Sequence, residues 1–329
     1  MLFRRPCYYD KFTCTADKCS DNCCIGWEIC IDKYTADFYH GVGGEFGKRL
    51  SESITADDEP SFILKGERCP FLNKNNLCDI IINLGEKALC QICRDHPRWF
   101  EWYGNKKEGG IGLSCEEGAR LILPEESFAD YFESETDEEP DKDFDEDAYR
   151  FLLSVRENIF DILCEDEPCF TDKANSILEL CAQAEARLNG CEKHSPAPFD
   201  FSSELSRALP VLEKTEHIDE KWTSAYKKLK GISLTPELIV DNEKYFVRLF
   251  AYFVWRYFLT SVFDYCVTEK IRFALFSVAV ISAIYCSCEE KGFDSLQILH
   301  NNAFRVGEFT LCGSRGWFYD AQTGNDKKV

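Results

Sequence analysis

The chain lacks the excess of positive charge that nucleic-acid binding requires. Its 329 residues carry 38 Lys and Arg against 58 Asp and Glu, which gives a formal net charge of −20. Proteins that bind a phosphate backbone present a basic surface to it. The composition therefore disfavours a nucleic-acid partner. It suits a lysine-rich or cationic protein partner, and it equally suits an ordinary acidic cytosolic protein.

Signals for export and for membrane insertion are also lacking. The first residues, MLFRRPCYYD, contain no apolar stretch of the kind that a signal peptide needs, so we expect a cytoplasmic protein. The longest apolar run, Phe273 to Cys286, is shorter than the roughly 18 to 20 residues that span a bilayer. We therefore expect no membrane span and a buried core helix over Thr268–Ser287.

Cysteine, in contrast, is abundant, with 19 residues in the chain, and it is concentrated in the N-terminal third. The clustered cysteines follow the patterns Cys14-x4-Cys19-x3-Cys23-Cys24, Cys69-Pro70, Cys78, Cys90-x2-Cys93 and Ser114-Cys115. In a reducing compartment such cysteines are more often metal ligands or free thiols than disulfides. Thiolates hold a metal when several converge from separate parts of the chain, so we expect a metal-binding module here.

The fold expected is mainly α, with an N-terminal cysteine-rich metal-binding module followed by a C-terminal helical bundle. The acidic stretch Glu133–Asp147 has too little apolar content to pack and is expected to be a solvated linker. The expected boundaries are a module at 1–132, a linker at 133–147, a helical domain at 148–312 and a flexible tail at 313–329. Helices are expected at Asp147–Leu163, Asp172–Leu188 and Pro236–Tyr265.

Local spacing suggests how the cysteines are presented. Cys19 and Cys23 are four positions apart, which places them on one face of a helical turn that Gly26 could end. Cys90 and Cys93 lie near the end of a helical-looking segment, Leu84–Arg94. Together with turns at Cys69 and Cys78, these two helix ends could close around one metal cluster.

The order of these motifs resembles the flagellin lysine-N-methylase family, part of a wider group of zinc- or iron-chelating domains with a CxxCxxCC-type signature. The matching pieces are Phe12-x-Cys14, Cys19-x3-Cys23-Cys24-x-Gly26-Trp27-x-Ile29-x-Ile31-Asp32, Arg68-Cys69-Pro70-Phe71-Leu72, Leu77-Cys78-x-Ile80, Leu84-Gly85-Glu86, Cys93-x2-His96-Pro97-Arg98 and Ser114-Cys115-Glu116-Glu117. The resemblance implies a lysine N-methyltransferase that uses S-adenosylmethionine, takes flagellin as its protein substrate and carries an iron–sulfur cluster on its cysteines.

Eight cysteines match the family pattern and are the candidate metal ligands: Cys14, Cys19, Cys23, Cys24, Cys69, Cys78, Cys93 and Cys115. A [4Fe–4S] cluster or a structural zinc uses four thiolates, so either four of these are spectators or two sites exist. We expect one [4Fe–4S] cluster, with zinc as the runner-up. Cys7, Cys30 and Cys90 fit the pattern less well and are expected to be packed thiols.

The radical signature Cys-x3-Cys-x2-Cys is absent, because Gly26 stands where its third cysteine belongs. Methyl transfer to an amine does not need a radical, since the nitrogen lone pair can attack a sulfonium methyl group in line. The candidate site residues are the polar residues inside the matched motifs, namely Asp32, Glu86, His96 and Arg98. Each of them could instead cap a helix or support the metal site.

The cofactor site is not visible in the sequence. The glycine-rich segment Gly41-x-Gly43-Gly44-x2-Gly47 follows the helix-like Lys33–Tyr39 rather than a strand, which disfavours a dinucleotide-type fold. A site for S-adenosylmethionine is expected at the junction of the module and the helical half. Two other functions stay open: a non-catalytic zinc- or iron-chelating module that binds a protein, and an iron–sulfur redox protein.

Overall fold

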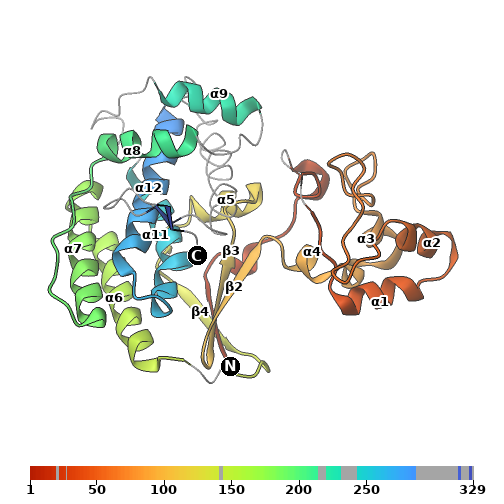
Figure 1. Ribbon diagram of the computed structural model, residues 1–329, viewed down its shortest axis with the longest axis horizontal. Helices are drawn as coiled ribbons and strands as arrows, with labels where there is room; N and C mark the ends of the chain where they lie inside the picture. The colour runs from red at the N-terminus through yellow and green to blue at the C-terminus, as the bar shows by residue number, and fades with distance from the viewer. Residues whose placement is uncertain are drawn as a thin grey trace. The chain divides into compact units, whose positions relative to one another are not determined.

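The computed structural model describes residues 1–19, 22–26, 28–140, 144–213, 220–230, 243–286, 318–319 and 326–327 (Figure 1). The fold is mainly helical, as the sequence predicts. The chain divides into two compact units, which we call the helical unit and the cysteine unit. The helical unit comprises Met1–Lys11, Phe100–Ser114 and Gly118–Val329, and the cysteine unit comprises Phe12–Trp99 and Cys115–Glu117.

The helical unit contains a four-stranded sheet that the sequence analysis did not anticipate. Its strands run in the order β2-β3-β1-β4 and are β1 (Leu2–Pro6), β2 (Arg98–Tyr103), β3 (Lys106–Ile111) and β4 (Tyr131–Glu135). β1 pairs in parallel with β3 and antiparallel with β4. The edge strand β4 includes residues 133–135, which were expected to belong to the acidic linker.

The acidic edge strand is held by basic residues of its neighbour. The Arg4 guanidinium lies 2.5 Å from the Glu133 carboxylate, and Arg5 donates to the Ser134 hydroxyl at 2.9 Å. These pairings explain why a segment with so little apolar content is nevertheless ordered as a strand.

The helices of this unit pack mainly on one another. They are α5 (Glu116–Ile122), α6 (Glu146–Cys164), α7 (Phe170–Asn189), α8 (Phe201–Glu213), α9 (Glu220–Leu229), α11 (Glu243–Tyr257), η4 (Phe258–Val262) and α12 (Val267–Cys286). α12 packs against α7, α8 and α11. The predicted helices at 147–163, 172–188 and 268–287 are confirmed to within a few residues. Residues 236–242 of the predicted helix at 236–265 lie outside the described part of the chain, and so do most of the expected tail residues.

The apolar run of α12 forms core. Ile271, Leu275, Val278 and Ile281 are fully buried among the other helices, which confirms the prediction of a core helix. No helix among the described residues is both long and apolar enough to cross a membrane.

A buried ion pair joins the sheet to the helices. The Arg156 guanidinium of α6 donates to both carboxylate oxygens of Glu108 on β3, at 2.7 Å and 2.6 Å, and its centre lies 4.4 Å from the Trp255 ring centroid. Both charged side chains are almost completely buried. The two-point geometry compensates much of the cost of removing these charges from water.

One lysine of the sheet is enclosed by aromatic rings. The Lys107 ammonium lies 4.3 Å from the centroid of the Phe100 ring, 4.8 Å from that of Trp102 and 5.8 Å from that of Phe3. Phe3 and Lys107 are register partners on β1 and β3, and Glu138 forms an ion pair with Lys107. The rings stabilise the ammonium through their electron-rich faces.

The cysteine unit consists of short elements joined by turns. These are η2 (Ala16–Lys18), α1 (Lys33–Gly41), α2 (Gly44–Glu52), α3 (Asp79–Leu84), η3 (Glu86–Ala88) and α4 (Gln91–Asp95). The predicted helix at 84–94 is broken, because Gly85 has a positive φ of 85° that ends α3 and begins η3. Residues 20 and 21 of the predicted helical turn between Cys19 and Cys23 lie outside the described part of the chain; η2 ends at Lys18 and Cys19 has extended backbone.

Candidate functional site in the cysteine unit

Backbone pairing brings two distant cysteines together. The Cys69 N–H donates to the Cys24 carbonyl at 2.9 Å, and the Gly26 N–H donates to the Glu67 carbonyl at 2.7 Å. Gly26 has a positive φ of 81°, a conformation that glycine adopts at little cost. The segments at 24–26 and 67–69 therefore run side by side.

Five cysteines belong to the buried core of this unit, and we call them the inner thiol group. Cys69 and Cys90 are buried in the core, and Cys24, Cys78 and Cys93 pack against it while partly exposed. Two of them stand at helix starts, since Cys78 precedes α3 and Cys90 precedes α4. The inner thiol group thus gathers cysteines from turns and helix starts, whereas Cys19 and Cys23, expected to present thiols from a helix end, lie outside it. It also contains Cys90, which matched the family pattern less well.

The inner thiols influence one another's ionisation. A hydrogen bond between Cys90 and Cys93 lowers the pKa of Cys90 and raises that of Cys93, and negative charge at Cys24 raises the pKa of Cys93 further. Burial raises the pKa of Cys69 to about 11, and it also raises the pKa of Cys78. Because each thiolate opposes the next, several could be ionised together only beside a compensating positive charge.

The other four candidate ligands lie apart from this core, and we call them the outer thiol group: Cys14, Cys19, Cys23 and Cys115. Cys14 and Cys23 are exposed. A hydrogen bond with Cys24 raises the pKa of Cys23, and the nearby thiols of Cys14 and Cys115 raise it further. The Cys19 sulfur lies 3.7 Å from a Glu116 carboxylate oxygen. Cys24, to which Cys23 is hydrogen-bonded, packs against the core and belongs to the inner thiol group.

Within the described part of the chain, no three His, Cys, Asp or Glu side chains are arranged so as to hold a metal ion. The donor types of the inner thiol group nevertheless suit a thiolate-bound centre, because Zn²⁺ and iron–sulfur clusters are both held by four cysteines. The metal and its ligands remain a prediction. Cys90 was not among the predicted ligands, and it is buried in the same core as Cys69.

The four polar candidates occupy different places in the cysteine unit. Asp32 caps α1 by accepting from the Thr35 N–H at 3.0 Å, and it also accepts from the Gln91 N–H at 2.8 Å. Glu86 is exposed at the start of η3. The Arg98 guanidinium lies 5.1 Å from the Phe12 ring centroid.

His96 differs from the others in being buried at its ring nitrogen. Its Nε2 has no hydrogen-bond partner among the described residues, and burial lowers its pKa. The imidazole is therefore neutral near pH 7. Of the four polar candidates, Asp32 alone lines the pocket described next.

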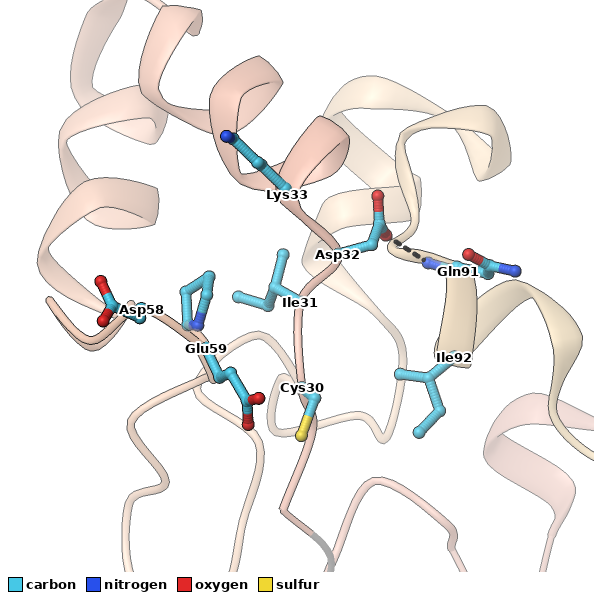
Figure 2. Close-up of a pocket in the computed structure, with 9 residues that line it drawn as sticks. Cys30, Ile31, Asp32, Lys33, Asp58, Glu59, Gln91 and Ile92 are labelled. Atoms are coloured by element: carbon cyan, nitrogen blue, oxygen red, sulfur yellow. Dashed lines mark hydrogen bonds between the residues drawn. The ribbon is translucent and has the colours of Figure 1, made fainter.

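A pocket of about 440 Å³ opens beside α4 (Figure 2). It is lined by Cys30, Ile31, Asp32, Lys33, Asp58, Glu59, Pro60, Gln91 and Ile92. Gln91 and Ile92 of α4 form one wall, and α4 also carries Cys93 and follows Cys90 in the sequence. Cys30 was expected to be a packed thiol, but it is exposed here, at the surface of the pocket.

Comparison with known proteins finds similarity to a flagellar biosynthetic protein and to lysine-N-methylases. It is 31% identical over 131 residues to the flagellar biosynthetic protein FliU of Salmonella muenchen, a match that covers 36% of this chain and 75% of that protein. It is 30% identical over 131 residues to the lysine-N-methylases of Salmonella typhimurium and Salmonella choleraesuis. That match spans 31% of the length of each methylase.

The chain belongs to the flagellin lysine-N-methylase family. No protein-family model matches it, and no solved structure matches it. The family was predicted from the ordered cysteine motifs, and that prediction is confirmed.

Proposed function

We propose that the protein is a protein-lysine N-methyltransferase that takes its methyl group from S-adenosylmethionine and acts on flagellin. The observation that carries this proposal is the similarity to proteins named lysine-N-methylase in two Salmonella species. The acidic composition agrees with it, because a net charge of −20 favours the approach of a lysine-bearing surface.

We further propose that the inner thiol group holds a [4Fe–4S] cluster, with zinc as the alternative. Cys24, Cys69, Cys78, Cys90 and Cys93 offer more than the four thiolates that either centre requires. When bound, the centre would supply positive charge that offsets several thiolates and would tie separate segments of the unit together.

The chemistry expected is a polar displacement. The lysine Nζ lone pair attacks the methyl carbon, and a carbon–nitrogen bond forms as the carbon–sulfur bond breaks. The sulfonium then becomes a neutral thioether. A lysine has an ordinary pKa of roughly 10.4, so its ammonium must first give a proton to water or to a base. Asp32 is suited to positioning rather than to proton transfer, because its carboxylate already accepts from two backbone N–H groups.

The test uses the full chain purified without oxygen and incubated with S-adenosylmethionine and flagellin. Mass increments of about 14 Da on flagellin lysines are expected, since each transfer replaces one N–H hydrogen by a methyl group. Flagellin that stays unmodified with metal-loaded protein would overturn the proposal in favour of a non-catalytic chelating module. Absorbance and metal analysis of the same sample decide between the two centres, because stoichiometric zinc in a colourless protein would replace the cluster.

A further inference from the structure

The pocket beside α4 combines apolar walls with carboxylates. Ile31, Pro60 and Ile92 supply apolar surface, and Glu59 lies beside them. Figure 2 shows Ile92 and Glu59 on opposite sides of Cys30, while the Lys33 side chain extends away from both. A ligand entering between these side chains would meet hydrocarbon along its length and negative charge at the edge.

The walls of the pocket are fixed by backbone hydrogen bonds. The Ile31 N–H donates to the Pro60 carbonyl at 2.7 Å, and the Phe62 N–H donates to the Ile29 carbonyl at 3.0 Å. On the other side, Asp32 holds the first residue of α4 through the Gln91 N–H at 2.8 Å. The pocket is therefore formed by paired backbone segments before any ligand binds.

The charges of the pocket are largely uncompensated. Asp58 and Glu59 are exposed, and within the described part of the chain neither forms an ion pair. The backbone N–H donors at Asp32 keep that carboxylate ionised as well. Lys33 is the basic residue of the lining, and it points away from Glu59.

Lysine is the side chain that matches this lining, because it has an aliphatic stem and a compact ammonium at its tip. Carboxylates favour the charged form of a nearby amine, whereas an amine that accepts a methyl group must be neutral. A lysine bound in this pocket would stay charged. The pocket is therefore suited to recognise a lysine, and the lysine that accepts the methyl group must lie elsewhere.

We propose that the pocket lined by Glu59, Ile92 and Asp58 binds a protonated lysine side chain of the protein substrate, other than the lysine that is methylated. The identity of that partner as a methylated protein rests on the proposed function. The binding itself does not require methyl transfer, so the two can be tested separately.

The first experiment measures binding of a capped peptide with several spaced lysines, without S-adenosylmethionine, by calorimetry. The reference ligand is the same peptide with norleucine in place of lysine, which keeps the stem and removes the charge. The double variant Asp58→Asn with Glu59→Gln is expected to weaken lysine-peptide binding by about five-fold at low salt, since each exposed charge pair contributes modestly. Equal affinities for the two peptides would overturn the proposal.

The matched control is Asp37→Asn with Glu45→Gln, which changes the charge equally at two exposed carboxylates of the same unit that do not line the pocket. Melting temperatures of both double variants establish that each is folded. If binding weakens equally in the two double variants, net charge alone accounts for the effect, and the proposal is overturned.

A second readout uses the exposed thiol of Cys30. Alkylation of each thiol is followed by peptide mass mapping. The lysine peptide is expected to slow the alkylation of Cys30 and to leave the alkylation rate of Cys191, an exposed thiol of the helical unit, unchanged. If S-adenosylmethionine protects Cys30 from alkylation and the peptide does not, the pocket binds the cofactor rather than a lysine, and the proposal is overturned.

The methylation assay separates the failure of this inference from failure of the proposed function. In the Asp58→Asn, Glu59→Gln variant, KM for flagellin is expected to rise with kcat unchanged. Unchanged KM together with normal methylation would refute the pocket and leave the methyltransferase intact. Charge-dependent peptide binding in a protein that methylates nothing would support the pocket and refute the methyltransferase.

Discussion

The backbone N–H of Cys69 donates to the carbonyl of Cys24 at 2.9 Å, which makes neighbours of two cysteines that are far apart in the sequence. This contact arises from backbone pairing rather than from the thiols. The scaffold that gathers the inner thiol group is therefore formed by the chain itself. A metal centre bound there would add its binding free energy to a fold that already brings the ligands together.

Cysteine replacement should separate the inner from the outer thiol group. We expect the double variant Cys69→Ser with Cys93→Ser to abolish stoichiometric metal binding and to lower the melting temperature of the metal-loaded protein, because it leaves three of the five inner thiols and either centre needs four thiolates. Cys23→Ser, in the outer thiol group, should retain the metal. Metal analysis and thermal unfolding of the two variants test this.

The control for cysteine replacement is Cys266→Ser, a half-buried thiol of the helical unit. Removing the metal from the wild-type protein with a chelator should reproduce the melting loss of the double variant Cys69→Ser with Cys93→Ser. The inner-group assignment would be wrong if Cys23→Ser lost its metal while that double variant kept its metal.

The buried pair of Arg156 and Glu108 should dominate the stability of the helical unit. We expect Arg156→Met to cost about 3 to 5 kcal/mol, since it leaves the Glu108 carboxylate buried without its partner. Urea denaturation followed by circular dichroism measures the loss. Arg150→Met removes the exposed pair with Glu146 and should cost at most about 0.5 kcal/mol. Similar losses in the two variants would contradict this account.

Asp32 should contribute a pH-dependent part of the stability. Burial acts to raise its pKa, but the hydrogen bonds from Gln91 and Thr35 outweigh burial and lower it below the ordinary 3.8. A carboxyl group with a lowered folded-state pKa stabilises the fold above its unfolded-state pKa, and that contribution disappears as the pH falls through the folded-state pKa. Asp32→Asn keeps one oxygen that can cap α1 and removes the charge that the backbone N–H groups stabilise, so it should cost up to about 1 kcal/mol at pH 7.

The measurement for Asp32 is the free energy of unfolding of wild type and Asp32→Asn at pH 7 and below pH 3.8. The difference between the two proteins is expected to shrink in acid. Asp37→Asn, on the exposed side of α1, supplies the reference. A difference that stays constant over this range would show that ionisation of Asp32 is not involved.

Lys107, which is enclosed by aromatic rings, should contribute more to the free energy of unfolding than an ordinary surface lysine does. Lys107→Met removes its contacts with Phe100 and Trp102 and its ion pair with Glu138, so we expect a loss of about 1 to 2 kcal/mol. Lys193→Met removes the ion pair with Glu179 and should change stability by less than about 1 kcal/mol. Thermal unfolding distinguishes the two outcomes.

Long helical segments were the most predictable part of this fold. The helices α6, α7 and α12 have apolar residues at helical spacing over many turns, and their bounds were predicted to within a few residues. The sheet was missed because its strands are short and two of them carry many charges. β4 in particular is ordered through Arg4 and Arg5 of β1, and a local pattern does not reveal so distant a partner.

The candidate site was predictable in its residue types and less so in its grouping. Spacing led to the inner cysteines, but it could not show that Cys24 packs against the core while Cys23 is exposed, because the backbone pairing with Cys69 holds Cys24 there. Of the four polar site residues predicted from the sequence, only Asp32 lines the pocket. Asp58 and Glu59 reach it only through the pairing of residues 29–31 with 60–62, a long-range contact.

The order of the two units along the chain has a consequence for folding. The helical unit pairs β1 directly with β3, while residues 12–99 between these strands form the cysteine unit. Closing a long flexible loop costs entropy that grows with its length, and a compact insert makes the loop effectively shorter. Early folding of the cysteine unit, with whatever it binds, would therefore lower the barrier to assembling the sheet. Occupancy of the inner thiol group would then influence the folding rate of the helical unit through chain connectivity alone.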